Sequence, residues 1–149
     1  MTNDNKAVLR DYWEQVWNRR QVDKLWDYGT EDLVLHVGGA TLPGKIVGDA
    51  LASQWFDPFP DLHVTVEFQL AEGDLVAEWL TFKGTHSGID FLPGMFRAVG
   101  LPPIPARGNS FEFTQTSICR MESGRIAEIW EDFDRVRLFM QLGVELAVP

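Results

Sequence analysis

The chain has 149 residues and a formal net charge of −9. This length is typical of one domain with a sizeable core, and so acidic a chain is unsuited to a nucleic-acid backbone, which attracts clustered Lys and Arg. No apolar run reaches the ~18 residues of a membrane-spanning helix, and the N-terminus does not resemble a signal peptide. With Cys119 as its single cysteine, the chain cannot form an internal disulfide. We expect a single domain over residues 1–149, located in the cytoplasm, with no nucleic-acid or membrane partner.

Hydrophobic periodicity predicts helices first and strands afterwards. Apolar residues recur at helical spacing over residues 5–19, and shorter helices are expected over residues 22–28 and 48–56. The later segments alternate apolar and polar residues between turns, which is typical of strands. The strands are expected over residues 33–37, 63–70, 75–85, 111–121 and 125–133.

This order of elements predicts an α+β fold, in which the helices pack on one face of a bent antiparallel sheet. A curved sheet wrapped around a helix encloses a cone-shaped space that the inner faces of the strands line. A polar side chain on such a face needs an explanation, because burying an unpaired polar group is costly.

One face of the last strand is apolar except for a single acid. Side chains alternate between the two faces of a strand, so this face consists of Ala127, Ile129, Glu131 and Phe133. The opposite face carries two acids, although Ile126 and Trp130 on it favour the reverse assignment. We therefore expect Glu131 to be the acid that points inward.

An inward-facing Glu131 is a candidate general base, because desolvation raises the pKa of a carboxylate towards neutrality. The alternative is that Glu131 lies near the strand end and is simply solvated. Asp134 directly precedes the last predicted helix, residues 135–142, and is expected to cap it.

The strand before carries three small or polar residues on one face, Gln115, Ser117 and Cys119. Gln115 and Ser117 are candidate donors of hydrogen bonds to a ligand oxygen. The alternatives for both are cross-strand pairing or a position on a wet outer face. Cys119 is expected to fill space in the core.

The histidines are too dispersed in the sequence to predict a metal site. His36 and His86 end predicted strands, where the rim of the cone is expected, so both are candidate ligand contacts. The sequence contains no nucleophile motif and no glycine-rich phosphate loop. We expect neither a metal nor an organic cofactor.

Residues 88–109 form a long and unusually apolar predicted loop. Such a segment usually covers a cavity as a lid or packs against another subunit. Phe91 and Met95 in this loop are candidate substrate contacts.

Several segments, taken in order, resemble the SnoaL-like polyketide and ester cyclases of the nuclear transport factor 2-like superfamily. They are VWNRR, DLVLH, FPDLHVTVE, FKGTHSG, GLPP, SGRIAEIW and FMQLG, and together they span roughly residues 6–143. The resemblance implies a cone-shaped α+β barrel with the sheet wrapped around the N-terminal helices, and often a homodimer. In the characterised cyclases it implies a cofactor-free intramolecular aldol ring closure.

The resemblance also implies roles for particular residues. The acid–base Asp of the family corresponds to Glu131 and its Gln to Gln115, while the family's His is replaced by Ser117. The aromatic residue of the first helix that touches the substrate corresponds to Trp17. Glu in place of Asp moves the carboxylate by about one methylene, and even ~1 Å of misplacement slows catalysis. His86 or His36 is a candidate substitute for the missing His.

The predicted function is that of a small-molecule enzyme, a cofactor-independent cyclase or isomerase-type lyase acting on a hydrophobic carbonyl compound. Glu131 is the expected base, with Gln115, Ser117 and His86 as its partners. The expected walls of the pocket are Trp17, Trp79 and Trp130. The alternative is a non-catalytic ligand-binding or dimerisation module of the same fold, and the direction of the Glu131 side chain distinguishes the two.

Overall fold

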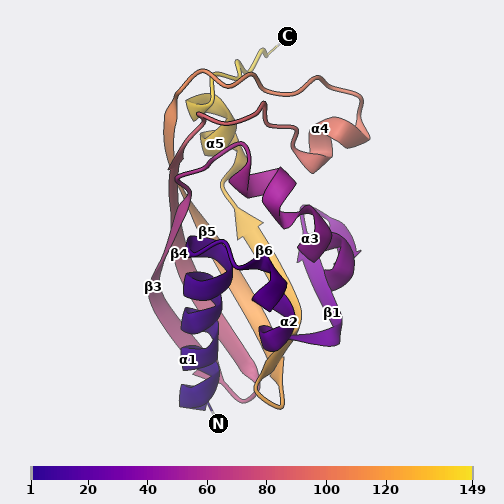
Figure 1. The fold of residues 1–149 in the computed structure, drawn as a ribbon, viewed down its shortest axis with the longest axis vertical. Coiled ribbons are helices and arrows are strands. Elements are labelled where there is room, and N and C mark those ends of the chain that lie inside the picture. The colour runs from indigo at the N-terminus through magenta and orange to yellow at the C-terminus, as the bar shows by residue number, and fades with distance from the viewer. Residues whose placement is uncertain (1, 149) are drawn as a thin grey trace.

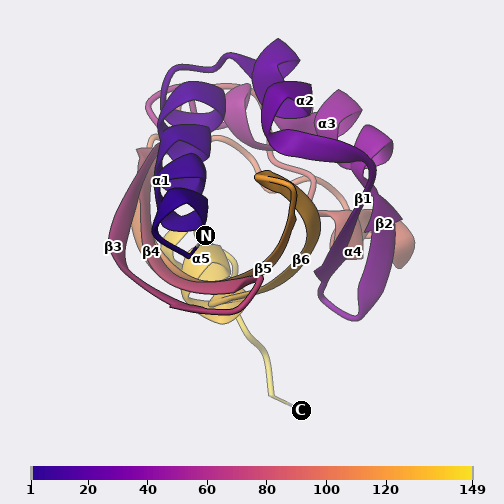
Figure 2. The same ribbon diagram turned by 90° about the horizontal axis from the view of Figure 1, so that it is seen from below.

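The structure is a computed structural model that describes residues 2–148 (Figure 1). It has the expected α+β architecture, with a six-stranded sheet in the order β2-β1-β6-β5-β4-β3. Seen from below, the sheet curls and α1 lies inside the curl (Figure 2). The strands are β1 (Gly29–Val37), β2 (Ala40–Pro43), β3 (His63–Glu72), β4 (Leu75–Thr85), β5 (Ser110–Glu122) and β6 (Arg125–Phe133).

The helices fall on the expected segments, although α3 begins at Gly44 rather than at residue 48, and three short segments are π-helical or 3₁₀-helical. The first helix, α1 (Thr2–Tyr12), continues as the π-helical segment η1 (Trp13–Asn18), and α3 (Gly44–Leu51) continues as η3 (Ala52–Phe56), also π-helical. The remaining helices are η2 (Val22–Lys24), α2 (Leu25–Tyr28), α4 (Gly94–Ala98) and α5 (Arg135–Gln141). No helix in residues 2–148 combines the length and the apolar character needed to cross a membrane.

The sheet differs from the expectation in the two strands that pair with β1. The segment after the first strand forms β2, which pairs with β1 through a turn at Gly38 and Gly39, both of which adopt positive φ. Two adjacent positive φ angles favour glycine and suit a tight hairpin. Strand β1 also pairs with β6 in parallel, so the expectation of a wholly antiparallel sheet is wrong at this one pair.

The core lies on the concave face of the sheet, against α1 and η1. Trp13 and Trp17 of η1 both meet the ring of Phe82 on β4 edge to face, with ring centroids 6.0 and 5.7 Å apart. Phe82 in turn stacks on Phe113 of β5 at 4.9 Å. Aromatic pairs of this kind favour edge-to-face and offset geometries, and here they fix the first helical segment over the middle of the sheet.

The predicted helix cap at Asp134 is confirmed. Its carboxylate accepts a hydrogen bond from the backbone nitrogen of Arg137 at 3.0 Å, which satisfies a free amide in the first turn of α5. Asp134 therefore has the structural role of a helix N-cap, as expected.

Candidate functional site

Four strands bring a row of polar side chains together on the concave face. The register places Gln69 of β3 opposite Glu78 of β4, Glu78 opposite Ser117 of β5, and Ser117 opposite Glu131 of β6. Directly opposed residues of antiparallel strands lie on the same face of the sheet. Glu78, Ser117 and Glu131 are therefore neighbours across the centre of the curl.

The burial of β6 agrees with the predicted inner face. Ala127 and Ile129 are buried, and Glu131 is half-buried, whereas Trp130 and Asp132 are exposed. Ile126 is buried as well, because the register shifts near Arg120 and adds an extra residue to β6. Ile126 favoured the opposite assignment of the two faces in the sequence, and the β-bulge explains why: beyond it, the side chains of β6 change face.

The environment of Glu131 favours its neutral form. Desolvation is the largest effect and raises the pKa of Glu131 to about 7, and the negative charge of Glu78 raises it further. The positive charge of Arg135 opposes this shift. Although some of the Glu131 side chain remains accessible, the protein atoms around its carboxyl remove enough water to bring its pKa near neutrality.

Gln115 lies on the same face of β5 as Ser117, two residues before it, and its amide includes an unpaired donor. Its side chain is buried, and its Nε2 has no hydrogen-bond partner of ordinary geometry among the described residues. The amide is still close enough to Glu131 to lower the pKa of that carboxyl, the smallest of the four effects on it. A buried donor without a partner is unusual in proteins, so this amide is available to donate to a ligand oxygen.

Ser117 lies fully buried between the two carboxyls of the row. Its hydroxyl contacts only the sulfur of Cys119, at 3.9 Å, among the side chains described. Burial raises the pKa of the Cys119 thiol well above its usual value, so Cys119 is unsuited to act as a nucleophile. Ser117 therefore retains a hydroxyl that can rotate towards a ligand.

Glu78 is a site residue that we did not expect from the sequence. Its side chain is 2% exposed; Trp13 Nε1 donates to one oxygen at 3.0 Å, and Gln69 Nε2 donates to the other at 2.8 Å. Desolvation is the largest influence and raises the pKa of Glu78. The sequence does contain an indication of this role, because Glu78 is the lone acid among Val76, Leu80 and Phe82 on one face of β4.

Trp17 of η1 packs on the concave side of the sheet against Phe82 of β4, and its predicted contact with a substrate stays a prediction. It is buried, and its Nε1 donates to the hydroxyl of Tyr12 at 3.0 Å. Burial is the main cause that raises the pKa of Tyr12, and the charges of Glu131 and Glu78 raise it further. Tyr12 and Trp17 therefore belong to the same interior environment as the two carboxyls.

The expectation that Trp79 and Trp130 form walls of an interior pocket is wrong. Both rings are 38% exposed and lie on the convex face of the sheet. Trp79 stacks with Phe68, and Trp130 stacks with His36 at a centroid distance of 5.4 Å. Strand alternation directs these rings away from the row that holds Glu131.

His36 shares this convex location and does not reach the concave face. Its Nε2 pairs with Glu128 at 2.6 Å and its Nδ1 pairs with Thr41 at 3.1 Å. These bonds hold His36 on the outside of the sheet, where it stacks on Trp130. The prediction that His36 contacts an interior ligand is therefore wrong.

His86 is also remote from the row of carboxyls, so its prediction as a catalytic partner of Glu131 is wrong. It follows the end of β4, eight residues beyond Glu78, which is about 26 Å along a strand at ~3.3 Å per residue. His86 is buried, pairs through Nε2 with the carbonyl oxygen of Ile89 at 3.0 Å, and packs against Phe59. These contacts anchor the long loop.

Of the two predicted contacts in that loop, one is buried and one is not. Phe91 pairs with Ile104 across the loop and packs against the rings of Phe59 and Trp55. Met95, in α4, is 52% exposed. The structure therefore gives Phe91 a packing role within an aromatic cluster and gives Met95 no place on the concave face.

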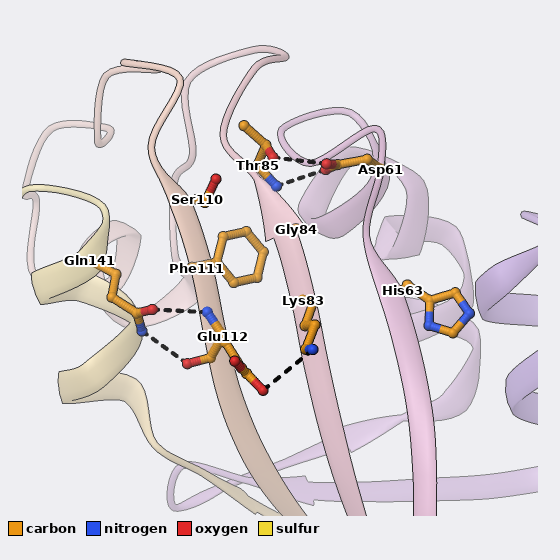
Figure 3. A pocket seen from close by; sticks show the side chains of 9 residues that line it. All are labelled: Asp61, His63, Lys83, Gly84, Thr85, Ser110, Phe111, Glu112 and Gln141. Atoms are coloured by element: carbon orange, nitrogen blue, oxygen red, sulfur yellow. Dashed lines mark hydrogen bonds and ion pairs between the residues drawn. The ribbon is translucent and has the colours of Figure 1, made fainter.

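A separate depression on the surface does not belong to this site (Figure 3). It lies over the ends of β3, β4 and β5, and several of its polar groups are paired with one another. Asp61 accepts two hydrogen bonds from Thr85, and Gln141 pairs with the backbone of Glu112. Among the residues that the structure describes, no three His, Cys, Asp or Glu side chains gather closely enough to hold a metal ion.

Comparison with known proteins identifies the family. The model of the SnoaL-like polyketide cyclase family matches residues 7–142, so the chain belongs to this family. None of the curated proteins compared with the chain is similar enough to count as a match.

Solved structures show the same fold. AclR, a proposed hydroxylase from Streptomyces galilaeus, has a TM-score of 0.80 at 22% identity, over 100% of this chain and 87% of that one. A proposed SnoaL-like polyketide cyclase from Jannaschia sp. CCS1 has a TM-score of 0.81 at 17% identity, over 98% and 96%. IdmH, a proposed polyketide cyclase from Streptomyces antibioticus, has a TM-score of 0.71 at 27% identity, over 94% and 99%.

Proposed function

We propose that this protein is a cofactor-free acid–base enzyme that acts on a small hydrophobic carbonyl compound, with Glu131 as its general base. The proposal rests on one observation, that two suitable groups lie side by side on the concave face. Glu131 is a carboxyl with a pKa of about 7, and beside it the buried Nε2 of Gln115 has no hydrogen-bond partner of ordinary geometry among the described residues. A base of this pKa works well near neutral pH.

The chemistry that suits this arrangement begins with an acidic α-proton. The Glu131 carboxylate takes that proton, and the electrons of the C–H bond move to the carbonyl oxygen to form an enolate. In this proposal Gln115 Nε2 and the Ser117 hydroxyl donate hydrogen bonds to this oxygen, because donors that face a developing negative charge lower the barrier. The enolate carbon then attacks a second carbonyl of the same molecule, and Glu131 returns the proton to the new alkoxide.

Exchange of α-protons with solvent tests this function without knowledge of the natural substrate. A panel of β-dicarbonyl esters in D2O is followed by NMR with and without the protein. Because the base must be ionised, the protein-dependent exchange rate is expected to rise with pH and to level off above about 7. Exchange no faster than in buffer, across the whole panel, would contradict the proposal.

We also propose that the chain forms a homodimer through the outer face of the sheet. Exposed apolar residues cluster there on neighbouring strands, and monomeric proteins rarely leave such a patch uncovered. This outer patch consists of Phe68, Leu70, Leu75, Trp79, Ile118 and Trp130. A second copy of the chain is the occupant that the family resemblance implies.

Replacement of Ile118 by Lys is expected to convert the dimer to a monomer, because it places a charge at the centre of the outer patch. Light scattering coupled to size-exclusion chromatography measures the mass. Ile46→Lys is the matched control, since Ile46 on α3 is also exposed, at 55%, but lies outside the patch. A wild-type chain that elutes as a monomer would refute the dimer.

A further inference from the structure

The concave face holds a second carboxyl that the proposed proton transfer does not use. Glu78 lies in the same row as Glu131, with Ser117 between them. The separation of opposed Cα atoms in antiparallel pairs is about 5 Å, so the two glutamates start about 10 Å apart across the row. Their side chains point to the same concave side of the sheet.

The charges of Glu78 and Glu131 both act on two buried side chains that come from different elements. Tyr12 of α1 and Cys119 of β5 each have a pKa that burial raises most and that both Glu78 and Glu131 raise further. The other charged group that acts on Glu131 is Arg135 at the start of α5, which stacks on Phe133. Arg10 of α1 acts on Glu78. The two carboxyls therefore share one interior environment.

The two carboxyls differ in how they are held. Each oxygen of Glu78 accepts one hydrogen bond from a fixed neutral donor, Trp13 Nε1 at 3.0 Å or Gln69 Nε2 at 2.8 Å. Gln69 is itself anchored through a bond to the backbone oxygen of Lys6 at 3.0 Å. Glu131 has only a weak contact with the Gln115 amide, the smallest influence on its pKa. Hydrogen bonds to a carboxylate stabilise its charged form, so the two bonds to Glu78 oppose the desolvation that raises its pKa, and of the two carboxyls Glu78 is the better suited to hold the negative charge.

We propose that Glu78 is a positioning residue for Glu131: its buried charge, held by Trp13 and Gln69, makes Glu131 the member of the pair that carries the proton. The inference rests on the proposed role of Glu131 as the base, and it assigns to Glu78 the task of keeping that base protonated up to neutral pH. A carboxyl that is about half protonated near pH 7 can both take a proton from carbon and return one to oxygen. Glu78 itself stays covered by η1 and β3 and does not touch the substrate.

Carboxyl-carbon NMR of the protein labelled at glutamate tests this coupling directly. Glu131 is assigned by the signal that disappears in Glu131→Gln, and its titration is then followed in wild type and in Glu78→Gln. Removal of a charge at this separation is expected to increase the acid dissociation constant of Glu131 about fivefold to tenfold. Glu78→Asp, which keeps the charge, is expected to retain most of the wild-type value.

Two further variants keep the test decisive. Glu112→Gln removes an exposed glutamate from the outer side of β5 and is expected to leave the titration of Glu131 unchanged. Trp13→Phe keeps a ring but removes one donor to Glu78, and is expected to increase the dissociation constant by a smaller factor even where Glu78→Gln does not fold. A dissociation constant for Glu131 that stays within twofold of wild type in these Glu78 and Trp13 variants would overturn the proposal.

The measurement makes no use of turnover, so the two proposals fail separately. If Glu131 is not the base, α-proton exchange survives in Glu131→Gln while the coupling to Glu78 is still seen by NMR. If Glu78 does not act on Glu131, the NMR titrations coincide and the role of Glu131 in exchange is unaffected.

Discussion

Replacing Glu131 with Gln is expected to lower protein-dependent α-proton exchange by about 10²- to 10⁴-fold, the usual contribution of a positioned general base. Glutamine keeps the size and one oxygen of the side chain but cannot accept a proton at neutral pH. The loss should fall on kcat rather than on KM, because the amide leaves the shape of the concave face unchanged. Exchange rates for an active β-dicarbonyl ester, measured by NMR in D2O, give both constants.

Asp132→Asn is the matched control for this substitution. Asp132 is the next residue of β6, so the same chemical change is made on the opposite, exposed face of one strand. Asp132→Asn is expected to catalyse α-proton exchange at the wild-type rate. Equal losses in the two variants would show that the effect arises from net charge or folding and not from the inward-facing carboxyl.

The stability of the protein is expected to fall as pH rises from 5 to 8, and Glu131 is expected to cause much of the fall. Its pKa is about 4.5 before folding and about 7 in the folded protein, so the folded state binds the proton more tightly. The resulting stabilisation is complete below pH 4.5 and is lost as pH rises through about 7. Over this window the loss is up to about 3 kcal/mol, since one pKa unit corresponds to about 1.4 kcal/mol.

Urea unfolding of wild type and Glu131→Gln at pH 5 and pH 8 measures this contribution. The variant lacks the titrating group, so its free energy of unfolding should change less between the two pH values than that of wild type. Taking the difference between the proteins removes the contributions of groups that both retain, such as Glu128, whose pKa is lowered most by its bond to His36. Parallel pH dependence in the two proteins would contradict the assigned environment of Glu131.

The inner face of β6 was predictable because strand geometry leaves little choice. Alternation with a period of two placed Glu131 with Ala127 and Ile129, and the structure confirms that face. The same argument applied to β4 would have identified Glu78, the lone acid of its inward face. Local sequence is sufficient for such assignments wherever one side of a strand is uniformly apolar.

The tryptophans show where residue type misleads. The sequence offers Trp79 and Trp130 as candidate walls of the pocket, yet each is stabilised outside by a neighbouring ring, Phe68 or His36. Trp130 also has the strand parity of Glu128 and Asp132, which correctly indicates the outer face. Parity along a strand is therefore a better guide to direction than the hydrophobicity of one residue.

Long-range pairing was the part of the fold that the sequence concealed. The parallel contact of β1 with β6 joins segments about 90 residues apart and leaves no local signal in either strand. His86 was grouped with the site because it ends a strand, but the register places the carboxyl row far from that end. Distances of this kind depend on strand length and register, and neither follows from composition.

A crystal structure with a bound β-dicarbonyl ester would show whether Glu131 and Gln115 face the reacting atoms. One carbonyl oxygen of the ligand is expected within hydrogen-bonding distance of Gln115 Nε2, and its α-carbon is expected about 3–3.5 Å from a carboxyl oxygen of Glu131. A ligand that binds instead in the surface depression lined by Asp61 and Gln141, or on the outer patch, would contradict this expectation.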